Sequence, residues 1–142
     1  MNERDRWDYI LKLDEELLLG GVILSEWCSF IVREADAAFV AGANLAAILT
    51  SVSGIETYLR SEYGYGKGES LFRMIDTAPI DDTLRSGLHR LRMYRNQWVH
   101  VADPEDDQDI QEHPEKYSAE LQDMARLAVT VLRQVIYENQ CV

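Results

Sequence analysis

The sequence of 142 residues is poor in cysteine and contains no long hydrophobic run. Its two cysteines, Cys28 and Cys141, lie far apart and lack the paired spacing of zinc-binding or dithiol motifs. Two isolated thiols are typical of a reducing compartment. No apolar stretch is long enough to span a bilayer, and the N-terminus lacks the apolar segment of a signal peptide. These absences predict a cytoplasmic protein without a membrane partner.

Positive charge is also scarce. The chain has 14 Lys and Arg against 25 Asp and Glu, a net charge of -11. This balance argues against nonspecific nucleic-acid binding, which draws its strength from Lys and Arg neutralising phosphates. However, the segment 83–100 holds four arginines and no acid. A local basic face can therefore exist on an acidic protein.

Strand signals and internal repeats are absent, whereas helical periodicity runs through most of the chain. With 46% hydrophobic residues, the composition predicts one all-α domain covering residues 1–142. Asn44 and Asp81 or Asp82 are candidate helix caps. The glycines of "GYGKGES" predict a helix connection, because a P-loop needs Ser or Thr where Gly68 stands. We expect helices at about 4–19, 22–40, 69–77, 82–101 and 116–138, and one after Asn44 whose apolar stripe runs from Leu45 to Leu59 before the glycines break it.

An acidic segment separates the last two of these helices. Residues 103–115, "DPEDDQDIQEHPE", hold seven acids and two prolines and almost nothing to bury. This composition predicts a solvated loop. A metal site in the loop is the alternative, but we assign no metal ligand and no cofactor.

Arg95 stands out in the stretch "LRMYRNQWVH". With about 100° of rotation per residue, it lies roughly 40° from Leu91, inside the apolar arc of its helix. We therefore expect Arg95 to be partly buried. A buried guanidinium needs a partner. Glu56 is the candidate, because it lies on an apolar stripe of another helix, four residues after Val52.

A polar stripe is expected on the other side of the same helix. It combines basic and hydrogen-bonding side chains at helical spacing and can contact phosphates. Arg85, His89 and Arg92 on this stripe are therefore candidate ligand-binding residues. The stripe continues to Asn96 and His100.

Three residues at the end of this helix form the candidate catalytic set. Arg95 can hold a phosphate through two N–H groups, His100 can exchange protons near neutral pH, and Asn96 can orient either one. Together they fit phosphodiester chemistry. The alternative for His100 is a purely favourable interaction with the helix dipole.

At these residues the sequence resembles the HEPN superfamily, whose signature is an Arg, a polar residue, three further residues and a His. Here the motif reads Arg95-Asn96-Gln97-Trp98-Val99-His100. The resemblance extends over roughly residues 13–136. It implies an all-α bundle of four to five helices that forms a homodimer and brings two motifs together.

The resemblance also implies an activity. Many HEPN proteins are metal-independent endoribonucleases of toxin–antitoxin or antiviral defence systems, with an antitoxin or defence partner protein. The 2′-hydroxyl of RNA attacks the adjacent phosphate, and His100 would act as general acid or base. Arg95 would stabilise the charged phosphorane, and Asn96 would position His100 or the phosphate. With RNA as the substrate, Arg85, His89 and Arg92 on the polar stripe become the candidate RNA-binding residues.

Two other hypotheses remain open at this point. The chain can be a noncatalytic HEPN module that binds a nucleotide or a partner protein. It can also be a helical bundle in which Arg95 and Glu56 are only structural. Ala102 stands where HEPN toxins paired with a nucleotidyltransferase commonly carry Tyr, which argues against control by modification of that residue.

Overall fold

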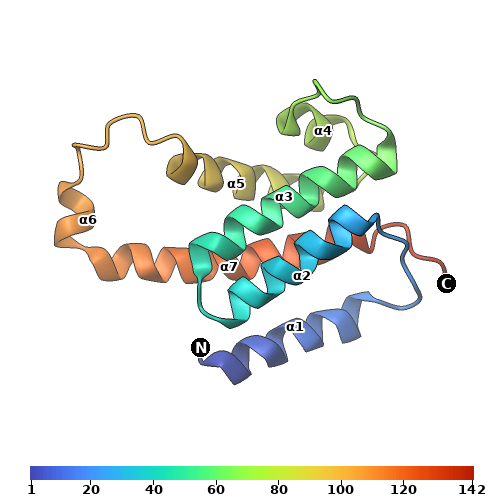
Figure 1. Cartoon of the computed structure of the whole chain (residues 1–142), viewed down its shortest axis with the longest axis horizontal. Helices are drawn as coiled ribbons and strands as arrows, with labels where there is room; N and C mark the ends of the chain where they lie inside the picture. The colour runs from blue at the N-terminus through green and yellow to red at the C-terminus, as the bar shows by residue number, and fades with distance from the viewer.

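The computed structural model describes residues 1–142 and is all-helical, as the periodicity predicts (Figure 1). Its only extended pairing is one isolated bridge between Gly21 and Cys141. No helix combines the length and apolarity needed to cross a bilayer. The seven helices are α1 (Glu3–Leu17), α2 (Glu26–Val40), α3 (Asn44–Tyr63), α4 (Leu71–Thr77), α5 (Asp82–Val99), α6 (Gln108–Glu112) and α7 (Pro114–Ile136).

Side-chain hydrogen bonds cap the starts of four helices, α1, α2, α4 and α5. Ser25 caps α2 and Asp81 caps α5, each by accepting a hydrogen bond from a backbone N–H of the first turn. Gly64 ends α3 in the left-handed conformation, with φ of 70°. The expected cap at Asn44 is wrong. Asn44 is the first residue of α3, and its side-chain oxygen accepts a hydrogen bond from Arg6 instead.

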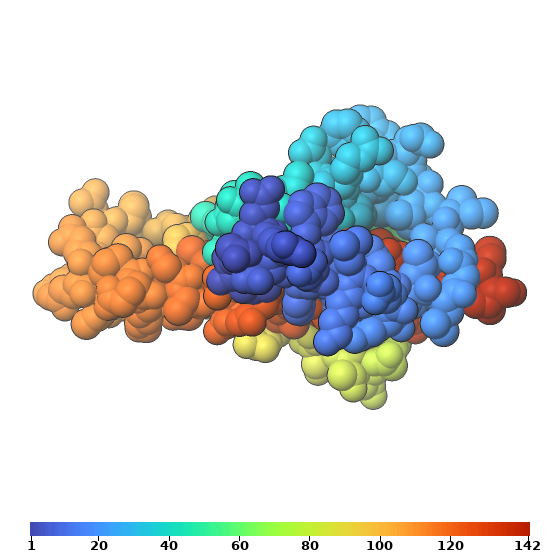
Figure 2. Space-filling view, turned by 90° about the horizontal axis from the view of Figure 1, so that it is seen from below, coloured from blue at the N-terminus to red at the C-terminus, as the bar shows by residue number.

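Helix α3 lies at the centre of the molecule. It packs against α2 and α7 and also contacts α4 and α5 (Figure 1). Gly54 permits this close packing, because a Cβ there would lie 3.2 Å from a methyl group of Leu132 on α7. The core is one cluster of 29 buried apolar residues. One end of the molecule, built from α6 and the start of α7, extends beyond this core (Figure 2).

The acidic segment 103–115 is only partly a loop. All of its residues are exposed, as predicted, but residues 108–112 form the short helix α6, and Pro114 already begins α7. Side-chain contacts explain the added order, because Asp109 accepts hydrogen bonds from Lys116 and Tyr117 of α7. With α4 and α6, the helix count exceeds the four to five that the HEPN resemblance implies.

The fully buried arginines are Arg6 and Arg133, which the sequence analysis did not single out. Arg133 of α7 is 3% exposed and bridges two other helices. Its Nε donates to Asp14 of α1 at 2.9 Å, and its Nη1 and Nη2 donate to Asp36 of α2 at 2.8 and 2.6 Å. Tyr137 also donates to Asp14, at 2.6 Å. Three helices therefore converge on one guanidinium.

We expect Arg133→Ala to lower the free energy of unfolding by about 3–5 kcal/mol, because the substitution leaves two partly buried carboxylates without their partner. Urea denaturation measures the change. Arg126→Ala is the matched control on the same helix, since its ion pair with Asp123 is exposed. Arg126→Ala should lower the free energy of unfolding by no more than about 1 kcal/mol. Equal losses in the two variants would contradict a structural role for Arg133.

The thiol of Cys28 is 1% exposed, and burial raises its pKa to about 11. The unfolded thiol ionises near 9.0, so between these values the folded state binds more protons than the unfolded state. Stability should therefore fall as pH rises from about 9 to about 11. Cys28→Ala should remove this component of the slope, whereas Cys141→Ala, at an exposed site, should leave it unchanged. Denaturation at several alkaline pH values distinguishes the variants.

Candidate functional site

The last turn of α5 holds the three candidate catalytic residues in one hydrogen-bonded arrangement. The side-chain oxygen of Asn96 accepts a hydrogen bond from Nε of Arg95 at 3.0 Å. The backbone carbonyl of Asn96 accepts from the N–H of His100, also at 3.0 Å, and this bond closes the helix. The side chains of Arg95 and Asn96 are therefore joined directly, whereas His100 is connected to Asn96 only through the backbone of the helix.

Arg95 is half-buried, as its position on the helix predicts. It forms no ion pair, and the bond from its Nε to Asn96 is its only side-chain hydrogen bond. A guanidinium carries five N–H donors, so the four on its terminal nitrogens remain available. These form the fork that binds two oxygens of a phosphate. His100 is exposed, and its ring forms no hydrogen bond or ion pair within the chain.

The predicted buried pair between Arg95 and Glu56 is wrong. Glu56 instead pairs with Arg60, one turn further along α3, with 3.2 Å between Arg60 Nη2 and Glu56 Oε1. The Glu56 side chain is 41% exposed, so it does not lie on the buried stripe of α3. A neighbour on the same helix is a closer partner than an arginine on another helix. Arg95 is therefore not held by a carboxylate.

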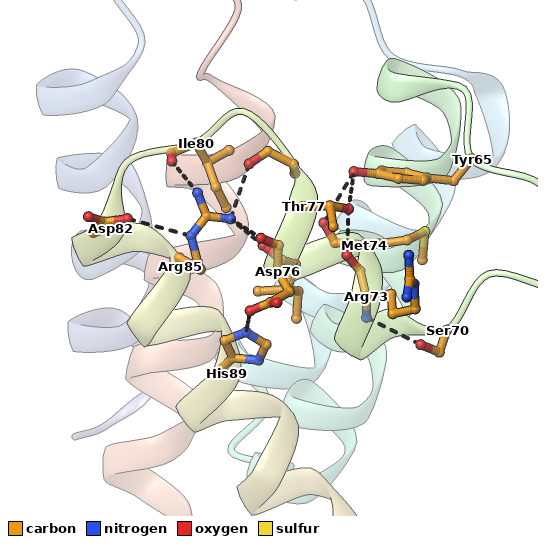
Figure 3. A network of polar contacts seen from close by, with 12 residues as sticks. Tyr65, Ser70, Arg73, Met74, Asp76, Thr77, Ile80, Asp82, Arg85 and His89 are labelled. Atoms are coloured by element: carbon orange, nitrogen blue, oxygen red, sulfur yellow. Dashed lines mark hydrogen bonds and ion pairs between the residues drawn. The ribbon is translucent and has the colours of Figure 1, made fainter.

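Arg85 is covered by α4. An RNA-binding residue is expected to be open to solvent, and Arg85 is not. Its Nη1 donates to the backbone carbonyls of Ile75 at 2.6 Å, Asp76 at 3.0 Å and Ala78 at 3.1 Å. Its Nη2 donates to the carbonyl of Ile80 at 2.8 Å (Figure 3). These carbonyls belong to the end of α4 and the turn that follows. Arg85 therefore joins α4 to α5.

His89 and Arg92 also face α4. The ring of His89 lies 5.2 Å from that of Phe72, and its Nε2 is 3.4 Å from Oδ1 of Asp76 (Figure 3). The guanidinium carbon of Arg92 lies 5.2 Å from the centre of the Phe72 ring. The prediction of an open basic face is thus wrong for the first half of α5. Periodicity within α5 indicates which residues share a face, but not that α4 packs on it.

A groove of about 580 Å³ runs between α5 and α7. Arg90, Met93 and Gln97 line one side and Glu120 and Asp123 line the other. Sequence analysis did not identify it, because its walls come from two helices distant in sequence. The only signal was the set of polar residues at helical spacing on α5. Its mixed charge does not indicate one class of ligand.

Tyr94 also lines this groove, and its buried hydroxyl has no hydrogen-bond partner. Burial raises the pKa of Tyr94, so the hydroxyl keeps its proton at neutral pH. No group of three or more His, Cys, Asp or Glu side chains lies together in a way that could hold a metal ion. The unpartnered donors of Arg95 and the exposed ring of His100 are therefore the clearest candidate site.

We expect Arg85→Ala to destabilise the fold by about 1–3 kcal/mol, because several carbonyls lose their donor. Arg95→Ala should cost about 1 kcal/mol or less, because only the bond to Asn96 is lost. Thermal and urea denaturation compare the two variants. A larger loss for Arg95→Ala than for Arg85→Ala would mean that Arg95 is mainly structural.

Comparison of the chain with family models, curated proteins and solved structures finds no match. The HEPN assignment therefore stays a prediction. Its support is the motif Arg95 to His100 and the geometry in which the structure holds it.

Proposed function

We propose that the chain is a metal-independent endoribonuclease of the HEPN type that acts in a toxin or defence system. The 2′-hydroxyl of RNA attacks the adjacent phosphorus, the bond to the 5′-oxygen breaks, and the products carry a 2′,3′-cyclic phosphate and a 5′-hydroxyl. One proton leaves the 2′-hydroxyl and one is delivered to the departing oxygen. His100 acts as general acid or base in these transfers.

The observation that carries the proposal is the free fork of Arg95. Its Nε is fixed by Asn96 at 3.0 Å, while its terminal nitrogens have no protein partner. A guanidinium oriented in this way is preorganised for the negative charge that develops on the phosphorane. A purely structural arginine in a half-buried position would be expected to use these donors within the protein, as Arg85 and Arg133 do.

The position of His100 supports the same reading. His100 ends α5 one turn after Asn96, which is the residue that orients Arg95, and the ring of His100 is exposed. A phosphate that contacts both Arg95 and His100 would have to lie across the end of α5. Of the three histidines, His100 is the nearest exposed one to Arg95 in the sequence, because His89 is held against α4 by Phe72 and Asp76.

A second function, nucleotide binding without catalysis, is favoured by a different observation. Of the four arginines in the segment 83–100, Arg85 and Arg92 are engaged by α4, whereas Arg90 and Arg95 form no hydrogen bond or ion pair with another helix. Two free arginines suit a single nucleotide better than a long RNA backbone. The exposed acids of the segment 103–115, directly after His100, would also repel a long polyanion.

The test is incubation of labelled tRNA and a single-stranded RNA with purified protein in EDTA, followed by end-group analysis. Wild type should release fragments with cyclic-phosphate ends. His100→Ala should lower the rate by about 10²–10⁴-fold, the usual contribution of a general acid or base. Arg95→Ala should lower it by about 10²–10³-fold, as for loss of a charge-stabilising donor. His113→Ala, which removes another exposed histidine, is the matched control and should cleave like wild type.

Cleavage by His100→Ala at the wild-type rate would contradict the assignment of His100. Intact RNA with every protein, including wild type, would reject the ribonuclease. In that case, a rise in melting temperature with a nucleoside phosphate that disappears in Arg95→Ala would support the binding module instead.

A further inference from the structure

A small cavity of about 130 Å³ lies between the end of α5, the short helix α6 and the start of α7 (Figure 1). It is smaller than the pockets of drug-sized ligands, so it can hold one compact chemical group. Three aromatic side chains from two helices line it: Tyr94 and Trp98 of α5 and Tyr117 of α7. The remaining lining residues are Gln97, Val101, Ile110 and Glu120.

The aromatic rings form a corner and not a slot. The rings of Trp98 and Tyr117 lie 6.4 Å apart, centre to centre, with 89° between their planes. A flat nucleobase stacks best between parallel surfaces, which perpendicular rings do not provide. A compact cation needs no parallel surfaces, because the negative face of each ring attracts it. The ring geometry therefore favours a cation over a base.

Glu120 places a negative charge in the wall of the cavity. This side chain is partly buried and forms no ion pair within the chain, and no Lys or Arg lines the cavity. Lys116, one turn earlier on α7, is paired with Asp109 at 3.2 Å. A carboxylate that is removed from water without a counterion is costly. A bound cation would remove this cost.

The hydroxyl of Tyr94 needs a hydrogen-bond partner. Tyr94 is 9% exposed, and its buried oxygen has none within the chain. Apart from burial, the groups that shift the pKa of this hydroxyl are Trp98 and Glu120, which both line the cavity. The hydroxyl is therefore directed toward the cavity. Because most buried polar groups in proteins are paired, a ligand that donates an N–H bond fits this position.

The acidic segment 103–115 adds a long-range preference for cations. Its seven acids are all exposed, and it contains no Lys or Arg. The same segment contributes Ile110 to the cavity wall. A concentration of one sign of charge raises the local concentration of ligands of the opposite sign. The surroundings of the cavity therefore attract cations and repel anions.

We propose that this cavity binds a primary alkylammonium group. The charge lies against Glu120 and the ring faces of Trp98 and Tyr117, and one N–H bond is donated to the hydroxyl oxygen of Tyr94. Arg95 lies about 100° further around α5 than Tyr94, so the cavity is separate from the candidate catalytic set. The proposal does not depend on the proposed ribonuclease activity. Small polyamines and lysine side chains of peptides both carry this chemical group.

The first test is an NMR titration of the tryptophan indole N–H signals with n-butylammonium chloride at constant ionic strength. The Trp98 signal should shift along a saturating curve, with a dissociation constant on the order of 1 mM for so small a ligand. Trp7 and Trp27 lie on other helices and are 45% and 79% exposed, so their signals are internal controls that should not shift. A Trp98 signal that does not move would overturn the proposal.

The second test removes the negative charge of the cavity. Glu120→Gln should raise the dissociation constant by about 10–100-fold, the effect of losing a hydrogen bond to a charged group. Asp123→Asn is the matched control, because Asp123 lines the neighbouring groove but not the cavity and is paired with Arg126. This control should bind nearly like wild type. Equal losses in the two variants would mean that net charge alone attracts the amine, and the site would be rejected.

The third test examines the hydrogen bond to Tyr94. Tyr94→Phe should weaken the binding of n-butylammonium by about 2–10-fold. It should leave the binding of tetramethylammonium unchanged, because that ion has no N–H bond to donate. Equal effects on the two ions would overturn the role of the hydroxyl. Circular dichroism of each variant shows whether the helices remain intact.

A final pair of ligands distinguishes the two sources of the alkylammonium group. Putrescine carries a second ammonium that can lie against the acidic segment, whereas Nα-acetyl-lysine methylamide carries a peptide backbone. Tighter binding of putrescine would identify a free polyamine as the ligand. Tighter binding of the lysine derivative would identify a lysine side chain of a peptide. Binding of neither would overturn the proposal.

Discussion

The fold depends on the buried guanidinium of Arg133. This side chain of α7 binds Asp14 of α1 and both oxygens of Asp36 of α2. A bidentate pair fixes direction as well as distance. Because Asp36 must face α7, the rotation of α2 about its own axis is set. Phe30 lies about 120° from Asp36 around the helix and is therefore placed on the outside. The exposure of Phe30 is thus a consequence of the buried pair.

The arginines of α5 differ in whether their donors are used within the protein. The first half of α5 is covered by α4, and Arg85 donates hydrogen bonds to backbone carbonyls at the end of α4 and in the turn after it. In the last turn of α5, Arg95 is hydrogen-bonded to Asn96 and has no carboxylate partner, and the exposed His100 follows at the helix end. One helix therefore serves two purposes: the first half builds the fold, and the end offers a fixed cation and a free imidazole.

Much of the fold was predictable from the sequence, because periodicity and capping are local properties. The all-α class, the cap at Asp81 and the end of α3 at Gly64 follow from residues close in sequence. The partial burial of Arg95 also follows from its angle on the helix. Helix α6 was missed because its order comes from contacts of Asp109 with residues of α7, not from its own composition.

The wrong predictions of side-chain partners share one physical cause. Periodicity shows which residues share a face of a helix, but it does not show which other helix packs on that face. Glu56 was expected to pair with Arg95. It pairs instead with Arg60, which lies four residues away on the same helix. Arg133 lies within the apolar stripe of α7, so a signal for its burial existed, yet its partners lie more than 90 residues away in the sequence. The cover of α4 over Arg85 and His89 likewise depends on tertiary packing.

In the proposed function, Arg95 and His100 contact the same phosphate. An NMR titration of the labelled Arg95 Nε and the His100 ring tests this with an RNA oligonucleotide whose 2′-oxygens are methylated, so that it binds without being cleaved. Both signals should shift together along one binding curve, while the signal of the His113 ring should not shift. Saturable RNA binding that leaves the Arg95 and His100 signals unmoved would contradict it.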